Sequence, residues 1–345
     1  MNILGIDTSC DDTSAGIIAD GRLVLSNVVH SQIRIHSPYG GVVPELASRE
    51  HLRNIMPVVR EALLRAHLEF PDLDAVSVTV GPGLVGSLLV GLYYAKAIAY
   101  THGIPMIGVN HLEGHILSIF LEETSPSFPF IALTVSGGHT SLYHVTGYGQ
   151  YTQLGQTLDD AAGEAFDKVS KILGLGYPGG VAIERQALSG CKDRINFPRV
   201  YLSNDSLNFS FSGLKTAVAL YIKKWREDGI ENNNITQADI AASFQESVVD
   251  VLVRKVMMAR DKTGISTIVI AGGVACNRAL RERLFREAEA HDLRVYIPSP
   301  QYCTDNGAMI ALAGYQRYLA GEFADLATDV RSKYPIKDLP LIEAC

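Results

Sequence analysis

Two histidines in the segment NHLEGHILSIF have the spacing of metal ligands on a helix. Residues four apart lie on one face of a helix, so the imidazoles of His111 and His115 can bind one metal ion together. Asp305 takes the corresponding place in the second half of the chain, after a strand and before a helix. Two imidazoles and a carboxylate leave coordination positions for water or substrate. The pattern favours a metal site; the alternative is two histidines with ordinary polar partners and an aspartate that caps the final helix.

The same segment lacks the general base of a zinc protease. In the HExxH motif a glutamate directly follows the first histidine, whereas here Leu112 stands at that position and Glu113 comes next. At about 100° per residue, Glu113 points roughly 200° away from His111 around a helix. A metalloprotease hypothesis therefore has no base beside the metal.

Three polar turns can bind an anion or present carboxylates. In VSGGH (residues 135–139) adjacent glycines expose backbone N–H groups that suit a phosphate, although a plain tight turn explains them equally well. Gly272 and Gly273 follow a buried strand and open a helix, with Asn277 one turn in, and N–H groups at a helix start suit nucleotide phosphates or ribose. The turn DTSCDD (residues 7–12) supplies carboxylates, with a solvated turn as the alternative.

These residues stand on a chain whose two halves follow the same order of elements. Each half begins with a strand, a polar turn and a second strand, NILGIDTSCDDTSAGIIA in the first and FIALTVSGGHTSLYHVT in the second. Each continues with a buried strand that ends in glycines, at Gly81 or Gly272, then a helix, one more strand, a loop and a helix. The shared order and offset indicate a duplication. We therefore predict an α/β fold of two similar domains that face a cleft lined by strand ends and glycine turns.

A chain of 345 residues is long enough for about two domains. We expect an N-terminal α/β domain over residues 1–125, completed by C-terminal helices over about 306–345. We expect the second domain over residues 126–305, with a helical insertion over about 159–265. The net charge of −7 argues against a protein that coats nucleic acid or membrane indiscriminately, without excluding a local basic groove.

The cysteines and the N-terminus predict a cytoplasmic protein. An odd number of five, without a CxxC pair, is neither a disulfide framework nor a metal knuckle, so we interpret the cysteines as bystanders. They are Cys10, Cys191, Cys276, Cys303 and Cys345. The opening MNILGIDTSCDD does not have the form of a signal peptide, and the most apolar stretch, residues 87–100, is shorter than the roughly 20 residues that span a bilayer. We expect a soluble protein with no membrane partner.

Seven segments in order resemble one family: NHLEGH, VSGGHT, DDAAGEAFDKV, YPGG, NFSFSGLKTAV, AGGVACN and TDNGAMIA. The family is TsaD, the tRNA N6-adenosine threonylcarbamoyltransferases formerly called O-sialoglycoprotein endopeptidases, and the resemblance runs from about Ile3 to Ala320. The duplicated halves are similar to the actin, sugar-kinase and Hsp70-type ATPase superfold. The resemblance implies transfer of a threonylcarbamoyl group from threonylcarbamoyl-AMP to the N6 amine of the adenosine 3′ of the anticodon, in tRNAs that read codons starting with A (t6A biosynthesis).

The resemblance also implies roles for single residues. His111, His115 and Asp305 match the family's ligands for one divalent metal ion, Fe²⁺ or Zn²⁺. Asp11 matches an acidic position near the reacting group, and we take it as the catalytic residue. The positions that hold the adenylate and threonylcarbamoyl parts of the substrate match Val135, Ser136, Gly137, Gly138, His139, Asp167, Gly180, Glu184 and Asn277. The family usually has Asp where this chain has Glu184.

The resemblance implies four partners: tRNA, a smaller TsaB-like paralogue without the metal ligands that forms a heterodimer, a TsaE-like P-loop ATPase, and a separate synthase that supplies the adenylate. Two other classes stay open. A small-molecule kinase of the same superfold needs a catalytic Asp and Mg²⁺ held by carboxylates, and the histidine pair weighs against it. A non-catalytic nucleotide-binding scaffold is the other class.

Overall fold

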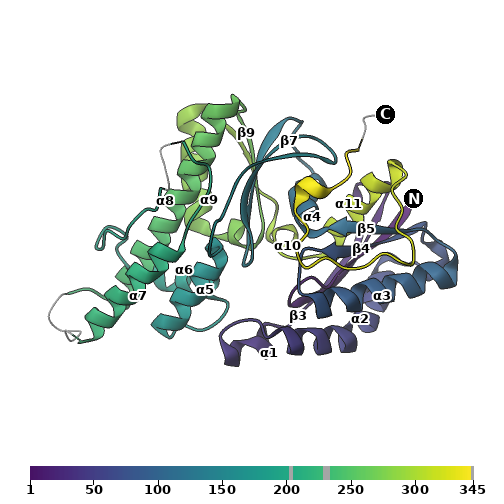
Figure 1. The fold of residues 1–345 in the computed structure, drawn as a ribbon, viewed down its shortest axis with the longest axis horizontal. Coiled ribbons are helices and arrows are strands. Elements are labelled where there is room, and N and C mark those ends of the chain that lie inside the picture. Colours follow the sequence, from purple (N-terminus) through teal and green to yellow (C-terminus); the bar gives the residue numbers. More distant parts are fainter. Residues whose placement is uncertain (202–204, 228–233, 343–345) are drawn as a thin grey trace. The chain divides into compact units, whose positions relative to one another are not determined.

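The computed structural model describes residues 1–201, 205–227 and 234–342, which form two compact units, each a sheet with its helices (Figure 1). Unit 1 consists of Met1–Phe128, Val145–Tyr151 and the chain from Pro298 onward, and unit 2 consists of Pro129–His144 and Thr152–Ile297. The chain rejoins unit 1 at Pro298, ahead of the change of domain that we expect after residue 305, so Asp305 belongs to the same unit as both histidines. Cys345 lies outside the described residues.

Unit 1 contains a five-stranded sheet in the order β3-β2-β1-β4-β5. Its strands are β1 (Asn2–Asp7), β2 (Asp12–Ala19), β3 (Leu23–Ser31), β4 (Ala75–Gly81) and β5 (Met106–Asn110). β1 pairs antiparallel with β2 and parallel with β4, so Ile6 lies opposite Ala15 on one side and Val78 on the other. Every residue of β4 is buried, as expected for a central strand covered on both faces.

Unit 2 repeats this arrangement in a second sheet of order β10-β9-β6-β7-β8. The strands of this sheet are β6 (Phe130–Val135), β7 (Thr140–Gly147), β8 (Gln150–Gln156), β9 (Thr267–Ala271) and β10 (Arg294–Tyr296). Residues 145–151, where β7 ends and β8 begins, are grouped with unit 1. In chain order β6 to β10 take the places of β1 to β5, and β6 pairs parallel with β9 as β1 does with β4. The predicted α/β fold of two similar domains is thereby confirmed.

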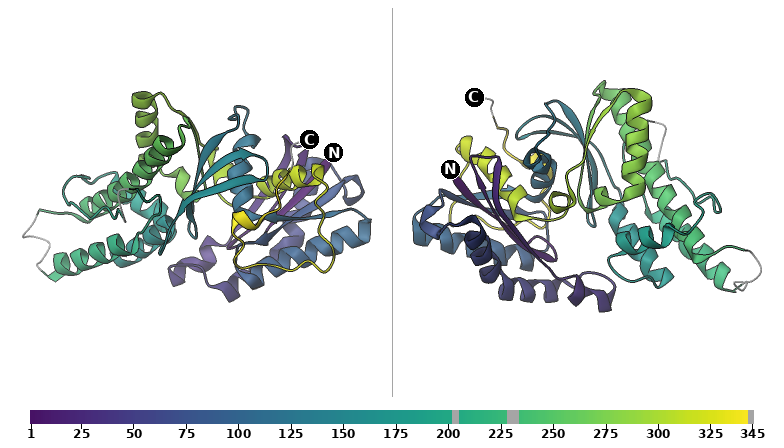
Figure 2. Two further views of the ribbon diagram at one scale, coloured as in Figure 1. Left: turned by 45° about the horizontal axis from the view of Figure 1, so that its top comes forward. Right: turned by 180° about the vertical axis from the view of Figure 1, so that it is seen from behind.

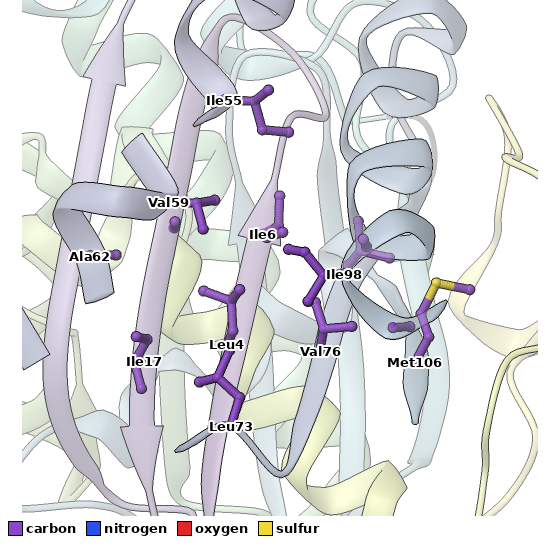
Figure 3. Close-up of a cluster of buried hydrophobic side chains, with 14 of the residues drawn as sticks. Leu4, Ile6, Ile17, Ile55, Val59, Ala62, Leu73, Val76, Ile98 and Met106 are labelled. Atoms are coloured by element: carbon purple, nitrogen blue, oxygen red, sulfur yellow. The ribbon is translucent and has the colours of Figure 1, made fainter. Parts of the chain in front are cut away.

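Helices cover both faces of the sheet in unit 1 (Figures 1 and 2). They are α2 (Pro44–Ala66) and α3 (Val85–His102) on one face, and α4 (His111–Leu117) and α11 (Gly307–Leu319) on the other. Side chains alternate along β1 between these faces: Leu4 joins the cluster beside α2 and α3 that Figure 3 shows, and Ile3 joins the cluster beside α11. Shorter elements are α1 (Ile33–His36), α10 (Pro300–Cys303) and the 3-10 helices Ser37–Tyr39, Phe70–Asp72, Ser118–Leu121 and Ile336–Asp338.

The longest helix of unit 2 carries much of its core. The helices are α5 (Ala162–Leu173), α6 (Gly179–Ala187), α7 (Ser212–Glu227), α8 (Gln237–Thr263) and α9 (Arg278–His291), with a 3-10 turn at Gly273–Cys276. α8 begins at a capping box in which Thr236 and Asp239 exchange side-chain-to-backbone hydrogen bonds. Its buried Phe244 packs edge-on against Phe166 of α5, with ring centroids 5.2 Å apart. Among the described residues, no helix is both long and apolar enough to cross a membrane.

Glycines in β1 and β2 let α11 approach the sheet closely. A Cβ atom on Gly5 would lie 2.2 Å from the carbonyl oxygen of Gly307, and one on Gly16 would lie 2.4 Å from the backbone nitrogen of Ala308. These contacts fix the first turn of α11 against the sheet. They therefore also fix Asp305, which lies two residues before that turn.

Replacing Gly16 by alanine should destabilise unit 1, because the added methyl group overlaps backbone atoms. We expect the free energy of unfolding to fall by roughly 1–3 kcal/mol, the usual cost of overpacking, as measured by chemical denaturation. Gly213→Ala is the matched control, since its added Cβ would meet only a side-chain carbon of Val200 at 3.4 Å. Equal stability of Gly16→Ala and the wild type would contradict the close packing of α11.

Candidate functional site

Helix α4 begins directly after β5 and carries both histidines. Asn110 caps the helix: its Oδ1 accepts hydrogen bonds from the backbone N–H groups of Leu112 at 2.9 Å and Glu113 at 3.4 Å. The cap makes His111 the first helical residue, and the four-residue spacing puts His115 on the same face. The two rings meet edge-on with centroids 4.6 Å apart. The sequence prediction of two imidazoles on one helix face is correct.

Asp305 joins the two imidazoles in unit 1. Its Oδ1 lies 3.1 Å from Nε2 of His115 and 3.4 Å from Nε2 of His111. One ligand atom from each of the three residues lies within 4.8 Å of the others, close enough to hold one metal ion. The alternative role of Asp305 as a helix cap is wrong, because Asn306 caps α11 by accepting from the backbone N–H of Met309 at 2.9 Å.

The other ring nitrogen of His111 is held by the end of β1. Oδ2 of the fully buried Asp7 lies 3.2 Å from Nδ1 of His111, and the Ser9 hydroxyl lies 3.2 Å from the same nitrogen. Oδ1 of Asp7 accepts from the backbone N–H of Ser9 at 3.0 Å. A carboxylate on the far nitrogen of a ligand imidazole orients the ring and raises its basicity. The sequence analysis assigned no such role to Asp7; its only signal is a carboxylate at a strand end.

The charges at this site are balanced by protons. Burial lowers the pKa of His111, but the carboxylates of Asp7 and Asp305 outweigh burial and hold that pKa well above its usual range. Burial raises the pKa of Asp305, and the imidazoles of His111 and His115 outweigh it and hold that pKa well below its usual range. A divalent cation would replace the imidazole proton and satisfy the same carboxylates. The donor set and its charge balance therefore fit a metal ion.

The turn that carries Asp11 and Asp12 is partly buried, so the solvated-turn interpretation is wrong. Oδ1 of Asp12 is buried and has no hydrogen-bond partner among the described residues. Burial, followed by the charges of Asp305 and Asp11, raises the pKa of Asp12 to about 8. The backbone carbonyl of Asp11 accepts a hydrogen bond from the N–H of Gln32 at 3.1 Å. Carboxyl groups are thus crowded beside the two histidines.

Glu113 is engaged on the opposite side of α4. It accepts hydrogen bonds from Nε and Nη2 of Arg317 at 2.7 and 2.9 Å and from the Tyr151 hydroxyl at 3.0 Å. Both ions of the Glu113–Arg317 pair are buried. This confirms that Glu113 does not supply a base for metalloprotease chemistry. The sequence analysis did not identify Arg317.

In unit 2 the predicted glycine turn follows β6, whose last residue is the buried Val135. The turn is closed by two hydrogen bonds: the N–H of Ser136 donates to the carbonyl of His139 at 2.8 Å, and the N–H of His139 donates to the Ser136 hydroxyl at 3.2 Å. Gly137 and Gly138 are exposed, and a Cβ atom on either would meet nothing within 4 Å. The turn is tight, and its outer side is open to a ligand.

Two further glycines let other segments pack against this turn. A Cβ atom on Gly163, in the first turn of α5, would lie 2.5 Å from the carbonyl oxygen of Ser136. Gly272 has φ +96, and its Cβ would lie 2.4 Å from the carbonyl oxygen of Val135. The start of α5 and the end of β9 therefore both abut the 135–139 turn. The structure brings together the glycine turns that the sequence analysis singled out in this half.

The remaining predicted residues connect the helices of unit 2. Oδ1 of Asp167 on α5 accepts from the N–H of Gly179 at 2.6 Å, which fixes the start of α6. Gly180 follows in the first turn of α6, with open space where a Cβ would lie. Oε1 of Glu184 accepts from the backbone N–H of Arg278 at 2.5 Å and so connects α6 to α9.

Asn277 is the N-cap of α9 and not a residue inside the helix, which corrects the sequence prediction. Its Oδ1 accepts from the N–H of Leu280 at 3.0 Å, and its Nδ2 donates to Oε1 of Gln245 at 2.8 Å. Next to it a pocket of about 230 Å³ opens between α6, α8 and α9, lined in part by Glu184, Gln245 and Arg278. The sequence analysis did not identify Gln245, whose position on α8 is distant in sequence.

Comparison of sequences relates this chain to one family of known proteins. A family model described as "TsaD: tRNA N6-adenosine threonylcarbamoyltransferase" matches residues 23–312. The chain is 52% identical over 339 residues to the tRNA N6-adenosine threonylcarbamoyltransferase of Thermodesulfovibrio yellowstonii, covering 97% of this chain and 100% of that protein. It is 55% identical over 316 residues to the protein of the same name from Geotalea uraniireducens, and the match covers 91% of this chain and 90% of that protein.

Solved structures with low sequence identity share the fold. HypF of T. kodakarensis is similar with a TM-score of 0.62 at 15% identity, over 93% of this chain and 48% of that one. Component A of (R)-2-hydroxyglutaryl-CoA dehydratase from Acidaminococcus fermentans has a TM-score of 0.54 at 17% identity, over 92% and 99%. At these identities the likeness concerns the fold alone, and it agrees with the predicted α/β fold.

One divalent ion should bind per chain at the three predicted ligands. The His111→Ala/His115→Ala double variant should lose the ion, because two of its three ligands are gone. Asp7→Asn keeps the ligands but weakens the hold on the His111 ring, so metal affinity should fall roughly 10–100-fold. Elemental analysis and chelator competition measure both effects, with the exposed His30→Ala as control. Equal metal content in the wild type and the double variant would rule out the site.

Asp12 should make the metal-free chain less stable as pH rises. Its carboxyl has an ordinary pKa of 3.8 when unfolded and about 8 when folded, so between these pH values the unfolded state releases a proton that the folded state keeps. Asp12→Asn removes this penalty. In excess chelator, the stability gained by the variant over the wild type should grow from about pH 5 to pH 8 in denaturant titrations. A gain that does not vary with pH would show that the carboxyl is solvated.

Proposed function

We propose that this chain transfers the threonylcarbamoyl group of threonylcarbamoyl-AMP to tRNA. The reason is that the chain belongs to the TsaD family of tRNA N6-adenosine threonylcarbamoyltransferases. The acceptor is the N6 amine of the adenosine 3′ of the anticodon, in tRNAs that read codons starting with A. One observation carries the proposal: the residues that match the family's ligands, His111, His115 and Asp305, converge in a chain that is 52% identical to a named transferase over nearly its whole length.

We assign one Fe²⁺ or Zn²⁺ ion to His111, His115 and Asp305, since two imidazoles and a carboxylate suit both metals. When bound, such an ion supplies a Lewis acid for the oxygen of the carbamoyl group. The contact of Asp7 with Nδ1 leaves Nε2 of His111 facing the other ligands. The elevated pKa of His111 and the lowered pKa of Asp305 support the assignment, because both shifts arise where buried carboxylates stabilise a positive charge.

We assign the adenylate to unit 2. The open side of the Gly137–Gly138 turn suits the phosphate, because backbone N–H groups can donate hydrogen bonds to its charged oxygens. The pocket beside Glu184 suits the nucleoside. The residues proposed to contact the substrate are Val135, Ser136, Gly137, Gly138, His139, Asp167, Gly180, Glu184 and Asn277. Binding of the AMP part holds the carbamoyl group in place for attack, and remote contacts of this kind raise the rate of the chemical step.

The N6 amine is proposed to attack the carbamoyl carbon directly, with AMP as leaving group. No covalent nucleophile of the protein is needed, because a mixed anhydride with AMP is already activated. The Cys10 thiol is no candidate for a covalent step: burial, followed by the charges of Asp11 and Asp305, raises its pKa well above the usual range. Asp11 is proposed as the catalytic carboxylate beside the reacting amine.

The proposed partners are tRNA, a TsaB-like paralogue in a heterodimer, a TsaE-like P-loop ATPase and a synthase that supplies the adenylate, all in the cytoplasm. The family name supports the first of these. The two histidines weigh against a kinase, whose Mg²⁺ prefers oxygen ligands. The engagement of Glu113 with Arg317 weighs against a metalloprotease.

Filling the glycine turn should separate transferase from protease. Gly137→Val should abolish adenylate binding in calorimetry and t6A formation in tRNA, because the new side chain occupies the space assigned to the phosphate. Fold and metal content should persist, since a Cβ at this position meets no protein atom within 4 Å. Modification of tRNA by the variant at the wild-type rate would refute the assignment. So would a wild type that cleaves glycoprotein and binds no adenine nucleotide.

A further inference from the structure

A chain of buried polar side chains leads from the start of α2 to the turn between β1 and β2. The backbone N–H of Val43 donates to Nδ1 of His36 at 3.3 Å, and Nε2 of His36 lies 3.1 Å from Oε1 of Gln32. Nε2 of Gln32 lies 3.4 Å from Nδ1 of His51, and Nε2 of His51 lies 3.0 Å from the carbonyl oxygen of Cys10. The three side chains are fully buried. We call them the His36–Gln32–His51 chain.

The two ends of this chain fix the direction of every hydrogen bond in it. A backbone N–H only donates and a carbonyl only accepts, so Val43 makes Nδ1 of His36 an acceptor and Cys10 makes Nε2 of His51 a donor. Each ring is then neutral, with its proton on Nε2. Gln32 joins the rings by accepting at Oε1 and donating from Nε2. Burial lowers the pKa of His51, which agrees with a neutral ring.

The same residues hold the β1–β2 turn at two adjacent carbonyls and also contact the start of β2. Besides the bond from His51 to the carbonyl of Cys10, the backbone N–H of Gln32 donates to the carbonyl of Asp11 at 3.1 Å. The Thr13 hydroxyl lies 2.7 Å from Nδ1 of His51. Residues 8–11 lie between the two strands, outside the ladder that pairs them. Gln32 and His51 therefore supply hydrogen bonds that the sheet does not give to this turn.

The position of this turn matters because the turn carries the Asp11 carboxyl group. Asp11 and Asp12 are adjacent, and the charges of Asp305 and Asp11 act on the buried carboxyl group of Asp12. Displacement of a reacting group by about 1 Å can lower a rate roughly 100-fold. The hydrogen bonds to the carbonyls of Cys10 and Asp11 therefore bear on the placement of the Asp11 carboxyl group.

We propose that His51 and Gln32 are positioning residues, which hold the backbone carbonyls of Cys10 and Asp11 and thereby fix the Asp11 carboxylate for the transfer reaction. The inference rests on the proposed function, since it takes Asp11 as the catalytic residue. The hydrogen bonds of His51 go to Thr13, Gln32 and Cys10, none of which is a proposed metal ligand. Loss of His51 should therefore change the chemical step and leave metal binding intact.

Two substitutions of His51 distinguish positioning from packing. The amide nitrogen of His51→Gln reaches the place of Nε2 and can still donate to Cys10, whereas that of His51→Asn reaches only the place of Nδ1. In the reconstituted system with its partners, His51→Asn should lower kcat about 100-fold, with the KM for threonylcarbamoyl-AMP and the metal content unchanged. His51→Gln should recover most of kcat. The exposed His30→Asn on β3 is the matched control and should behave as the wild type.

A second background shows whether His51 acts through Asp11. If it does, adding His51→Asn to Asp11→Asn should lower kcat little further, because the group that it positions is already lost. Nitrogen-15 NMR of labelled histidine should show His36 and His51 as neutral Nε2–H tautomers in the folded wild type. Equal losses in both backgrounds, a folded His51→Gln as slow as His51→Asn, or another tautomer of His51 would overturn the inference. A wild type that transfers no threonylcarbamoyl group would instead overturn the proposed function, and this inference with it.

Discussion

Carboxylates crowd around two imidazoles where β1 ends and α4 begins, and the rest of unit 1 is arranged around that excess of negative charge. Asp7 and Asp305 face His111, and Asp12 is close enough to share the repulsion. In the absence of a cation, protons relieve the repulsion: His111 and Asp12 both hold theirs to a higher pH than usual. A divalent ion at the proposed site would relieve the repulsion in place of the protons. Metal binding, proton release and the stability of unit 1 would then be linked.

The surrounding elements keep these charges from moving apart. α4 is joined to α11 by the buried Glu113–Arg317 pair, and loss of one partner of such a pair typically costs about 3–5 kcal/mol because the other charge is left buried alone. α11 is pressed on β1 and β2 at Gly5 and Gly16, where no side chain separates helix from strand. The Asp11 turn is held from outside the sheet by Gln32 and His51. Both histidines thus stand on α4, and Asp305 lies two residues before α11.

The sequence could predict those features that depend on residues close to one another along the chain. The spacing of His111 and His115 depends on one helix, and the shared order of elements in the two halves depends on a repeated pattern, so both followed from the sequence. Contacts between distant residues did not: Glu113 and Arg317 are 204 positions apart, and nothing in either segment indicates the other. The role of Asp7 could not be predicted for the same reason, because Asp7 contacts His111 only once β1 and α4 are packed together. Asn277 was expected one turn into a helix that opens at Gly272 and Gly273, but these glycines lead into a separate 3-10 turn, and α9 begins only after Asn277.

Mass spectrometry of tRNA nucleosides tests the proposed transfer most directly. Cells that depend on this protein and are depleted of it should contain unmodified adenosine in place of t6A, next to the anticodon of tRNAs that read codons starting with A. Wild-type protein should restore t6A, and Asp305→Ala, which removes a proposed ligand, should not. An unchanged t6A level after depletion, or full restoration by Asp305→Ala, would contradict the account.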